Sequence, residues 1–256
     1  MSTDRPPGEH ESPFLTASWR DIIMVTWAVD PSALRPYLAA GTELDLWEGD
    51  ALISLVAFDF RDTRVLGFRI PFHVRFPEVN LRFYVRRRTR DGTWRRGVTF
   101  IQEMVPRAAI AFVARTLYGE PYVARPMRRV AVPDQPLSAQ EPGASRSLVY
   151  EWKREGGWER VIALVTEPPR QMRRGSVESF IAEHYWGYTR RERKPTMEYR
   201  VEHPEWRISM TAGCMFEADL STLYGPRLAE IFTTTPVSTF VAEGSDVVVY
   251  RGQPVL

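Results

Sequence analysis

The chain has 256 residues, 34 of them basic and 32 acidic, which gives a formal net charge of +2 with neutral histidines. This balance argues against a polyanionic partner such as nucleic acid, and a hydrophobic content of 44% is typical of an ordinary globular protein. The single cysteine, Cys214, excludes an intrachain disulfide and a Cys-rich zinc site.

The N-terminal residues 1–13 carry acids and prolines where a signal peptide needs an apolar core. The longest apolar run, residues 108–114, is too short to cross a bilayer. We therefore expect a disordered tail over residues 1–13 and a single domain over residues 14–256. The protein is expected to be cytoplasmic and to have no membrane partner.

The first half of the chain predicts strands connected by turns. Asp21–Val29 is rich in β-branched and aromatic residues, and Asp30-Pro31 then supplies an N-cap with proline at the first helical position. Further strands are expected over residues 42–47, 51–60, 78–88 and 97–105, with residues 61–77 as an irregular loop. The last two strands flank Asp91-Gly92, a dipeptide typical of a β-hairpin turn.

The second half continues this pattern around a few helices. Pro106 begins a predicted helix that runs to about Tyr118, and its mostly apolar circumference favours a buried position. Strands are expected over residues 123–132, 145–153, 159–166, 198–202 and 206–212, with a proline-rich loop over 133–144. Ser176 marks a helix start, residues 226–232 predict another helix, and a final hairpin over 237–242 and 247–250 is expected to turn at 244–246.

Strands outnumber helices, and few helices lie between successive strands. The fold class indicated by this order is α+β with a mostly antiparallel sheet.

Common chemical signatures are missing. The sequence has no GxGxxG, GxxxxGK[ST], GxSxG or HExxH motif, and its four histidines never fall at metal-ligand spacing. No cofactor and no metal site is therefore predicted. The arginines around Asp91-Gly92 are interpreted as a solvated hairpin tip, because no aromatic stacking pattern accompanies them beyond Trp94. Tyr185, in the aromatic segment 185–188, is a candidate pocket residue, although such groups also fill cores.

Several segments together resemble one family. The run from Ser18 to Thr63, with FPEVNLRFYV, FIQEMVPRAAIAFVARTLYGEPY, FIAEHYWGYT and EHPEWRI, is similar to the YqjF-like family of unknown function. That family is placed in the acetoacetate-decarboxylase-like superfamily. The resemblance implies antiparallel sheets that form a cone-shaped β-barrel with a buried cavity. The decarboxylases assemble into oligomers, so a homo-oligomer is left open.

The resemblance also implies roles for two residues and the loss of others. Arg20 matches the decarboxylases' substrate-carboxylate arginine through VDPSALR, and Glu78 in FPEV matches a cavity glutamate. The position that matches the decarboxylases' second cavity glutamate is occupied by Ser54, so the resemblance implies that this carboxyl group is lost. The Schiff-base lysine is expected in VPRAAIAF, which contains no lysine, and the chain's two lysines, Lys153 and Lys194, are expected to be exposed. An imine mechanism is therefore not expected.

The remaining expectation is an apolar cavity with a few convergent polar groups, which is typical of a small-molecule site. We expect Arg20 and Arg107 to bind an anionic or carbonyl-containing metabolite with Tyr185, and Glu78 to be a catalytic acid or base. One hypothesis is lyase, hydratase or isomerase chemistry on a keto acid, and another is a non-catalytic binding or sensor module. A third interpretation is a structural protein whose cavity is filled by side chains. In a separate alternative, Arg20, Arg107 and Glu78 only pair with one another.

Overall fold

The computed structural model describes residues 13–108, 119–132, 135–138, 141–191 and 194–255. The expected tail over residues 1–13 lies outside these ranges except for Pro13, and so does most of the predicted helix over 106–118. Within the described ranges, no helix is long and apolar enough to cross a membrane.

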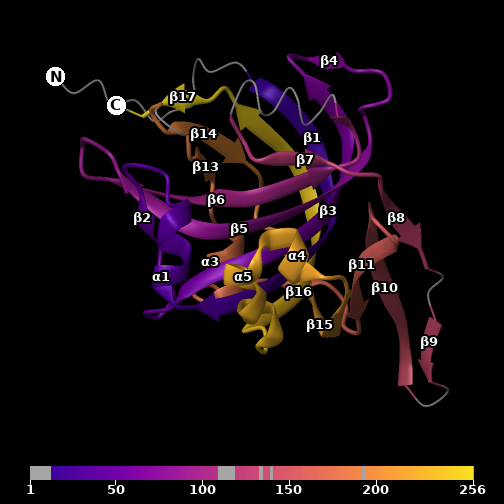
Figure 1. Ribbon diagram of the computed structural model, residues 1–256. Helices are drawn as coiled ribbons and strands as arrows, with labels where there is room; N and C mark the ends of the chain where they lie inside the picture. Colours follow the sequence, from indigo (N-terminus) through magenta and orange to yellow (C-terminus); the bar gives the residue numbers. More distant parts are fainter. Residues whose placement is uncertain (1–12, 109–118, 133–134, 139–140, 192–193, 256) are drawn as a thin grey trace.

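Strands dominate the described chain, and helices are few and short (Figure 1). The strands of the first half are β1 (Pro13–Val29), β2 (Glu43–Leu44), β3 (Ala51–Val65), β4 (Phe68–Arg69), β5 (Phe76–Arg88), β6 (Trp94–Val105), β7 (Tyr122–Ala124) and β8 (Met127–Ala131). Those of the second half are β9 (Gln135–Ser138), β10 (Glu141–Arg154), β11 (Gly157–Val165), β12 (Arg170–Gln171), β13 (Trp186–Thr189), β14 (Met197–Glu202), β15 (Arg207–Glu217), β16 (Ser238–Tyr250) and β17 (Gln253–Pro254).

The helical segments are α1 (Pro31–Leu34), η1 (Arg35–Tyr37), α3 (Val177–Ala182), α4 (Leu220–Tyr224), α5 (Pro226–Ala229) and η2 (Glu230–Thr233). Two of the expected helix starts are confirmed by their caps. Asp30 accepts a hydrogen bond from the Ser32 amide at 2.7 Å, and the Ser176 hydroxyl accepts one from the Ser179 amide at 3.3 Å.

The strand pairings close a circuit. They run from β1 to β3, β5, β6, β13, β14 and β16, and β16 returns to β1. Among the described strands, the β6–β7 and β6–β13 ladders are parallel and the others are antiparallel. The expected class, mostly antiparallel strands with few helices, is confirmed.

Two predictions about strands are wrong. Residues 237–250 do not form a hairpin, because β16 runs straight through and pairs with β1 from Thr26↔Ser238 to Pro13↔Tyr250. Gly244, which was predicted to lie in a turn, instead faces Trp19: a Cβ at Gly244 would lie 2.0 Å from the Trp19 carbonyl oxygen. The expected loop over 61–77 contains the end of β3, all of β4 and the start of β5.

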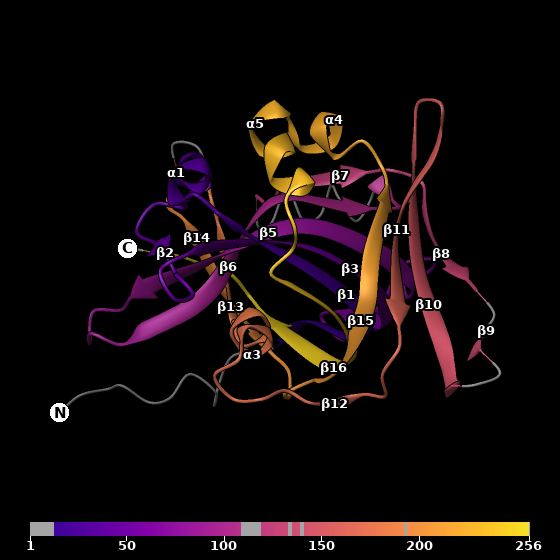
Figure 2. The same cartoon turned by 90° about the horizontal axis from the view of Figure 1, so that it is seen from below.

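The strands β1, β3 and β5 are buried on both faces. Figure 2 shows α4 and α5 on one side of the sheet and α3 on the other. Leu220, Leu223 and Leu228 from α4 and α5 pack into one hydrophobic cluster, and Phe180 and Ile181 from α3 pack into a second. A central cavity opens within the second cluster.

A bulge in β1 determines which of its side chains face this cavity. Asp21 has a φ of 56°, and the β1–β3 register shifts between Arg20 and Ile23. Such a bulge interrupts the strict alternation of side chains along a strand. Trp19 and Ile22 consequently both line the cavity, and Arg20 does not.

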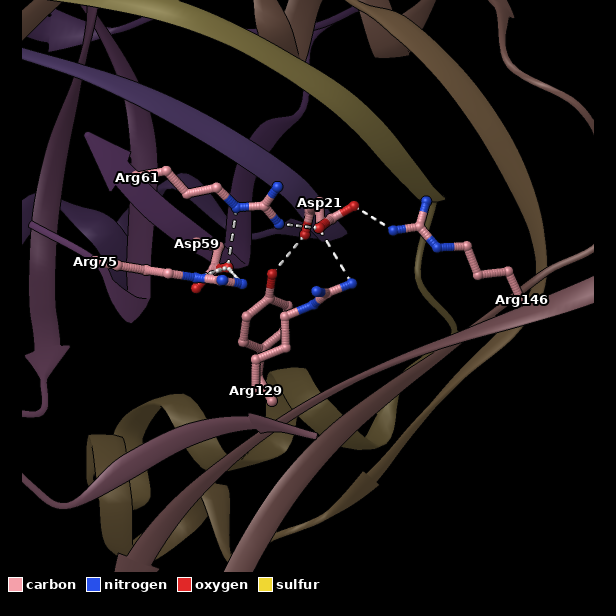
Figure 3. Close-up of polar contacts among 7 residues, drawn as sticks. Asp21, Asp59, Arg61, Arg75, Arg129 and Arg146 are labelled. Atoms are coloured by element: carbon pink, nitrogen blue, oxygen red, sulfur yellow. Dashed lines mark hydrogen bonds and ion pairs between the residues drawn. The ribbon is translucent and has the colours of Figure 1, made fainter. Parts of the chain in front are cut away.

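Seven residues form an ion-pair and hydrogen-bond network around this bulge, which we call the Asp21 network (Figure 3). Its members are Asp21, Asp59, Arg61, Arg75, Arg129, Arg146 and Tyr150. The Asp21 carboxylate accepts from Arg61 at 2.7 Å and from Arg146, and forms an ion pair with Arg129 at 3.1 Å. Because Arg129 and Arg146 come from β8 and β10, the network ties those strands to the bulge.

Candidate functional site

The central cavity has a volume of about 260 Å³ and is lined by described residues from both halves of the chain. Most of its wall is apolar and aromatic, with Trp19, Phe58, Phe60, Phe76 and Trp206 among the lining residues. It approaches the surface near Ile70, which is 42% exposed. Concave, mostly apolar pockets of this kind are typical small-molecule sites.

The polar groups of the cavity come from a few strands that the fold brings side by side. They are Glu78, Asn80 and Arg82 from β5, Glu103 from β6, Glu120 just before β7, Tyr122 from β7, His184 after α3 and Tyr199 from β14. The three on β5 share one face, because side chains two residues apart on a strand point the same way.

The pairing of β5, β6 and β7 explains how residues far apart in sequence meet. Asn80 lies opposite Glu103 in the β5–β6 ladder, and Glu103 lies opposite Tyr122 in the parallel β6–β7 ladder. The Glu103 amide donates to the Pro121 carbonyl at 3.1 Å, which fixes the turn that carries Glu120. Three carboxyl groups, Glu78, Glu103 and Glu120, thereby meet at one end of the cavity. We call them the cavity carboxyls.

Glu78 is held by two donors. The Asn80 side-chain amide donates to its Oε1 at 3.0 Å, and the Tyr122 hydroxyl donates to its Oε2 at 3.1 Å. Burial is the largest influence on this carboxyl, which is 3% exposed, and raises the pKa of Glu78 to about 7 against the two hydrogen bonds. A carboxyl group with a pKa near 7 can donate or accept a proton at neutral pH.

The pKa values of the other two cavity carboxyls are also raised. Burial raises the pKa of Glu120 to about 7, even though Thr189 donates to its Oε1 at 2.6 Å. Burial and the neighbouring charges of Glu120 and Glu78 raise the pKa of Glu103 well above its ordinary value. Below neutral pH the cavity carboxyls are therefore mostly neutral acids that can donate hydrogen bonds.

Arg82 is the one arginine among the described residues that line the cavity. None of the described carboxylates lies within ion-pair distance of it, and its buried Nε has no hydrogen-bond partner there. One oxygen each of Glu103 and Glu120 and the Nδ1 of His184 also lack partners within the described part of the chain. Buried polar groups are normally hydrogen-bonded, so these atoms are suited to contact a bound molecule.

His184 is a neutral group at physiological pH. Burial lowers its pKa to about 4, despite its contact with Asp45, whose Oδ2 lies 3.1 Å from the His184 Nε2. Asp45 also accepts from Arg96 at 2.6 Å. The charge of Asp45 is thus already balanced by Arg96.

The four residues proposed from the sequence are not brought together. Glu78 lines the cavity, whereas Arg20, Arg107 and Tyr185 do not. Arg20 has a side chain 35% exposed and pairs at 3.1 Å with Asp246, which is 87% exposed. Arg107 is exposed. The Tyr185 hydroxyl donates to Glu183, and its ring lies 4.9 Å from that of His203. The interpretation in which Arg20, Arg107 and Glu78 pair with one another is also not seen.

The sequence reasoning missed Arg82, Glu103, Glu120 and Tyr122. For Arg82 a signal was present, because Glu78, Asn80 and Arg82 alternate along a strand whose intervening residues are apolar. Glu103 is carried to Glu78 by the antiparallel β5–β6 pairing, whereas no local signal marked Glu120 and Tyr122, which reach Glu78 through the parallel β6–β7 pairing. Both lysines, Lys153 and Lys194, are exposed, and neither lines the cavity.

Comparisons with known proteins agree with this fold. The model of the DUF2071 family, described as an uncharacterised conserved protein, matches residues 16–246. The uncharacterised protein YqjF of Bacillus subtilis (strain 168) is 28% identical over 191 residues, which cover 73% of this chain and 72% of YqjF.

Two solved structures share the fold at low sequence identity. Acetoacetate decarboxylase from Legionella pneumophila superposes with a TM-score of 0.67 and 13% identity, over 99% of this chain and 93% of that one. The enduracididine biosynthesis enzyme MppR complexed with pyruvate gives a TM-score of 0.61 and 14% identity, over 98% and 93%. At these identities the likeness concerns the fold alone.

Proposed function

We propose that this chain, which belongs to the DUF2071 family of uncharacterised conserved proteins, binds a small keto acid in its central cavity and moves a proton on it. The observation that carries the proposal is the arrangement at the polar end of the cavity. Arg82, which has no ion pair among the described residues, lies near Glu78, a carboxyl group with a pKa of about 7. The proposed metabolite has a carboxylate for Arg82 and, next to its keto group, a C–H bond whose proton Glu78 can take.

The binding step uses charge and shape. The guanidinium of Arg82 can donate two parallel hydrogen bonds to a carboxylate. The protonated carboxyl of Glu103 can donate to the keto oxygen, because its raised pKa keeps it neutral. The aromatic wall of Trp19, Phe58 and Phe60 then accommodates an apolar chain or ring next to the keto group.

The chemical step is proton transfer at the carbon next to the carbonyl. The Glu78 carboxylate takes that proton, the C–H electron pair forms a C=C bond to the keto carbon as the C=O π pair moves onto the oxygen, and the resulting enolate is stabilised by the hydrogen bond from Glu103. Tyr122 and Asn80 position Glu78 through their hydrogen bonds. Enolisation of this kind begins lyase, hydratase and isomerase reactions of keto acids and needs no imine.

Exchange of protons for deuterium tests the proposal without knowledge of the full reaction. In D₂O, the proton NMR signal of the pyruvate methyl group, and that of the CH₂ group of a longer 2-keto acid, should lose intensity faster with the protein than without it. Glu78→Gln should slow this exchange at least about a hundredfold. Arg82→Gln should weaken binding about tenfold to a hundredfold, as expected for a charge-assisted bidentate contact.

The matched control is Arg227→Gln, which removes an exposed arginine far along the chain from β5. It should change neither exchange nor binding. An exchange rate that is unchanged in Glu78→Gln would contradict the catalytic part of the proposal, and unchanged keto acid binding in Arg82→Gln would contradict the binding part.

A non-catalytic ligand-binding or sensor module is the second candidate. It is favoured by the exposure of both lysines, which removes imine formation as a means of stabilising a carbanion. Keto acid binding that depends on Arg82, with proton exchange no faster than in buffer, would establish this alternative over the enzyme.

The absence of a buried amine gives a separate prediction. Incubation with acetoacetate and borohydride should add no mass to any side chain within residues 1–152, because that part of the chain contains no lysine. Peptide mass mapping would detect an adduct, and one specific reductive adduct in that region would contradict the proposed imine-free chemistry.

A further inference from the structure

A second, smaller pocket lies behind one wall of the central cavity. It has a volume of about 120 Å³ and is lined by Arg95 from β6, Trp186 from β13, Glu198 to Arg200 from β14, and Arg251 and Gln253 at the C-terminal end of the described chain. Trp186 and Tyr199 line both pockets. Its lining is rich in arginine, whereas that of the central cavity is rich in carboxyl groups.

The one carboxylate that lines the second pocket is already neutralised. Glu198 accepts from Arg87 at 2.6 Å on Oε2 and from Arg95 at 2.5 Å on Oε1. The guanidinium of Arg95 also stacks 4.2 Å from the Trp186 ring, which holds it at the pocket wall. Glu198 therefore has no charge left to balance a third arginine.

Arg200 is the buried arginine of this pocket. Its side chain is 10% exposed, and its guanidinium lies 4.0 Å from the Tyr250 ring. One of its nitrogens, Nη1, donates to Glu202, while Nε and Nη2 have no hydrogen-bond partner among the described residues. Glu202 also accepts from the Tyr250 hydroxyl at 2.6 Å. Buried guanidinium nitrogens without acceptors are costly, and an anion would relieve that cost.

Arg251 adds a fourth positive charge. It is exposed and forms no ion pair within the described part of the chain. Among the described residues, the lining arginines Arg95, Arg200 and Arg251, together with Arg87 on Glu198, are accompanied by two carboxylates, Glu198 and Glu202, which leaves an excess of two positive charges. Arginine donors in a fixed fork suit the oxygens of phosphate groups.

We propose that this pocket binds a dianionic oxyanion of the phosphate class. The excess charge of two matches such a dianion. The volume equals that of about four water molecules at roughly 30 Å³ each, which is enough for a tetrahedral anion. Because Arg251 is exposed, the pocket is open to solvent on that side, and the anion is either free phosphate or the phosphate group of a larger molecule.

Titration with inorganic phosphate, at an ionic strength held constant with sodium chloride, tests this site on the full-length protein. Isothermal calorimetry and the melting temperature should both show saturable binding. Arg251→Gln should weaken the phosphate affinity at least about tenfold without lowering the melting temperature of the free protein, because Arg251 is exposed. Arg200→Lys should weaken it while keeping the positive charge, because a point charge replaces the planar fork.

Two control variants locate the binding. Arg82→Gln should leave phosphate affinity unchanged, which separates this site from the keto acid site of the proposed function. Arg227→Gln should also have no effect. A phosphate monoester that binds more tightly than inorganic phosphate would identify a larger phosphorylated ligand, and weaker binding of the ester would identify the free anion.

The proposal is overturned if phosphate affinity is unchanged in both Arg251→Gln and Arg200→Lys. It is also overturned if phosphate raises the melting temperature no more than chloride of equal ionic strength. Binding that disappears in Arg82→Gln would assign the phosphate to the central cavity and would equally contradict the proposed site.

Discussion

The cavity carboxyls and the carboxylates of the Asp21 network are both buried, but their partners are opposite. Glu78, Glu103 and Glu120 contact hydroxyl and amide donors and one another, with one arginine nearby. Asp21 and Asp59 are surrounded by four arginines. In the first group, burial without paired cations raises the pKa. In the second, paired cations satisfy the charges.

This difference separates a reactive site from a structural one. Acids that keep their protons at neutral pH can exchange them with a ligand, and they reduce the stability of the fold whenever they ionise. Carboxylates held by several arginines cannot be used in this way, because removal of one partner leaves uncompensated charge. The same residue type thus has a chemical role inside the cavity and a positioning role at the bulge of β1.

The largest effect is expected where the Asp21 network is broken. Asp21→Asn should lower the free energy of unfolding by about 3 kcal/mol, near the lower end of the range for a broken buried ion pair, because the arginines are partly exposed. Asparagine tolerates the positive φ of 56° at this position, so the loss of stability is caused by removal of the charge and not by backbone strain. Urea denaturation measures it.

Asp62→Asn is the matched control. Asp62 also has a positive φ, 51°, and pairs with Arg69 at 2.9 Å, but both side chains are more than half exposed. This substitution should cost less than about 1 kcal/mol. Equal losses at the two positions would show that the Asp21 network has no special structural role.

The corresponding substitution in the cavity, Glu78→Gln, should raise the free energy of unfolding, whereas Asp21→Asn lowers it. The folded-state pKa of Glu78, about 7, lies above its ordinary value of 4.5, so the folded state keeps a proton that the unfolded chain loses. The free energy of unfolding should therefore fall as the pH rises from about 4.5 to about 7, and level off above it. Glu78→Gln mimics the protonated carboxyl and should be more stable than wild type at pH 8, because the glutamine carries no charge to desolvate.

The measurement is a series of urea denaturation curves between pH 5 and pH 8. The difference between Glu78→Gln and wild type should be small at pH 5 and should grow with pH. Glu230→Gln, which changes an exposed carboxylate, serves as the control and should follow the wild-type curve. A Glu78→Gln variant that is less stable than wild type at pH 8 would place Glu78 with the structural carboxylates instead.

The comparison also shows how far sequence reasoning extends. Local signals predicted the Asp30 and Ser176 caps, the Asp91-Gly92 hairpin and the strand that carries Glu78, because each depends on neighbouring residues. The arrival of Glu120 and Tyr122 beside Glu78 and Glu103 depends on a parallel pairing, β6 with β7, that no local signal predicts. The orientation of Arg20 depends on a bulge at Asp21, a non-glycine residue with positive φ that no turn motif announces.

The smallest effect is expected for Arg20, which the sequence had placed in the ligand site. Its ion pair with Asp246 is exposed, so Arg20→Ala should lower the free energy of unfolding by less than about 1 kcal/mol. Keto acid affinity should not change, because Trp19 and Ile22 line the cavity on either side of Arg20 while its own side chain does not. Calorimetry of Arg20→Ala beside Arg82→Gln measures the contrast. A tenfold loss of affinity in Arg20→Ala would mean that the bulge in β1 rearranges on ligand binding and turns Arg20 toward the cavity carboxyls.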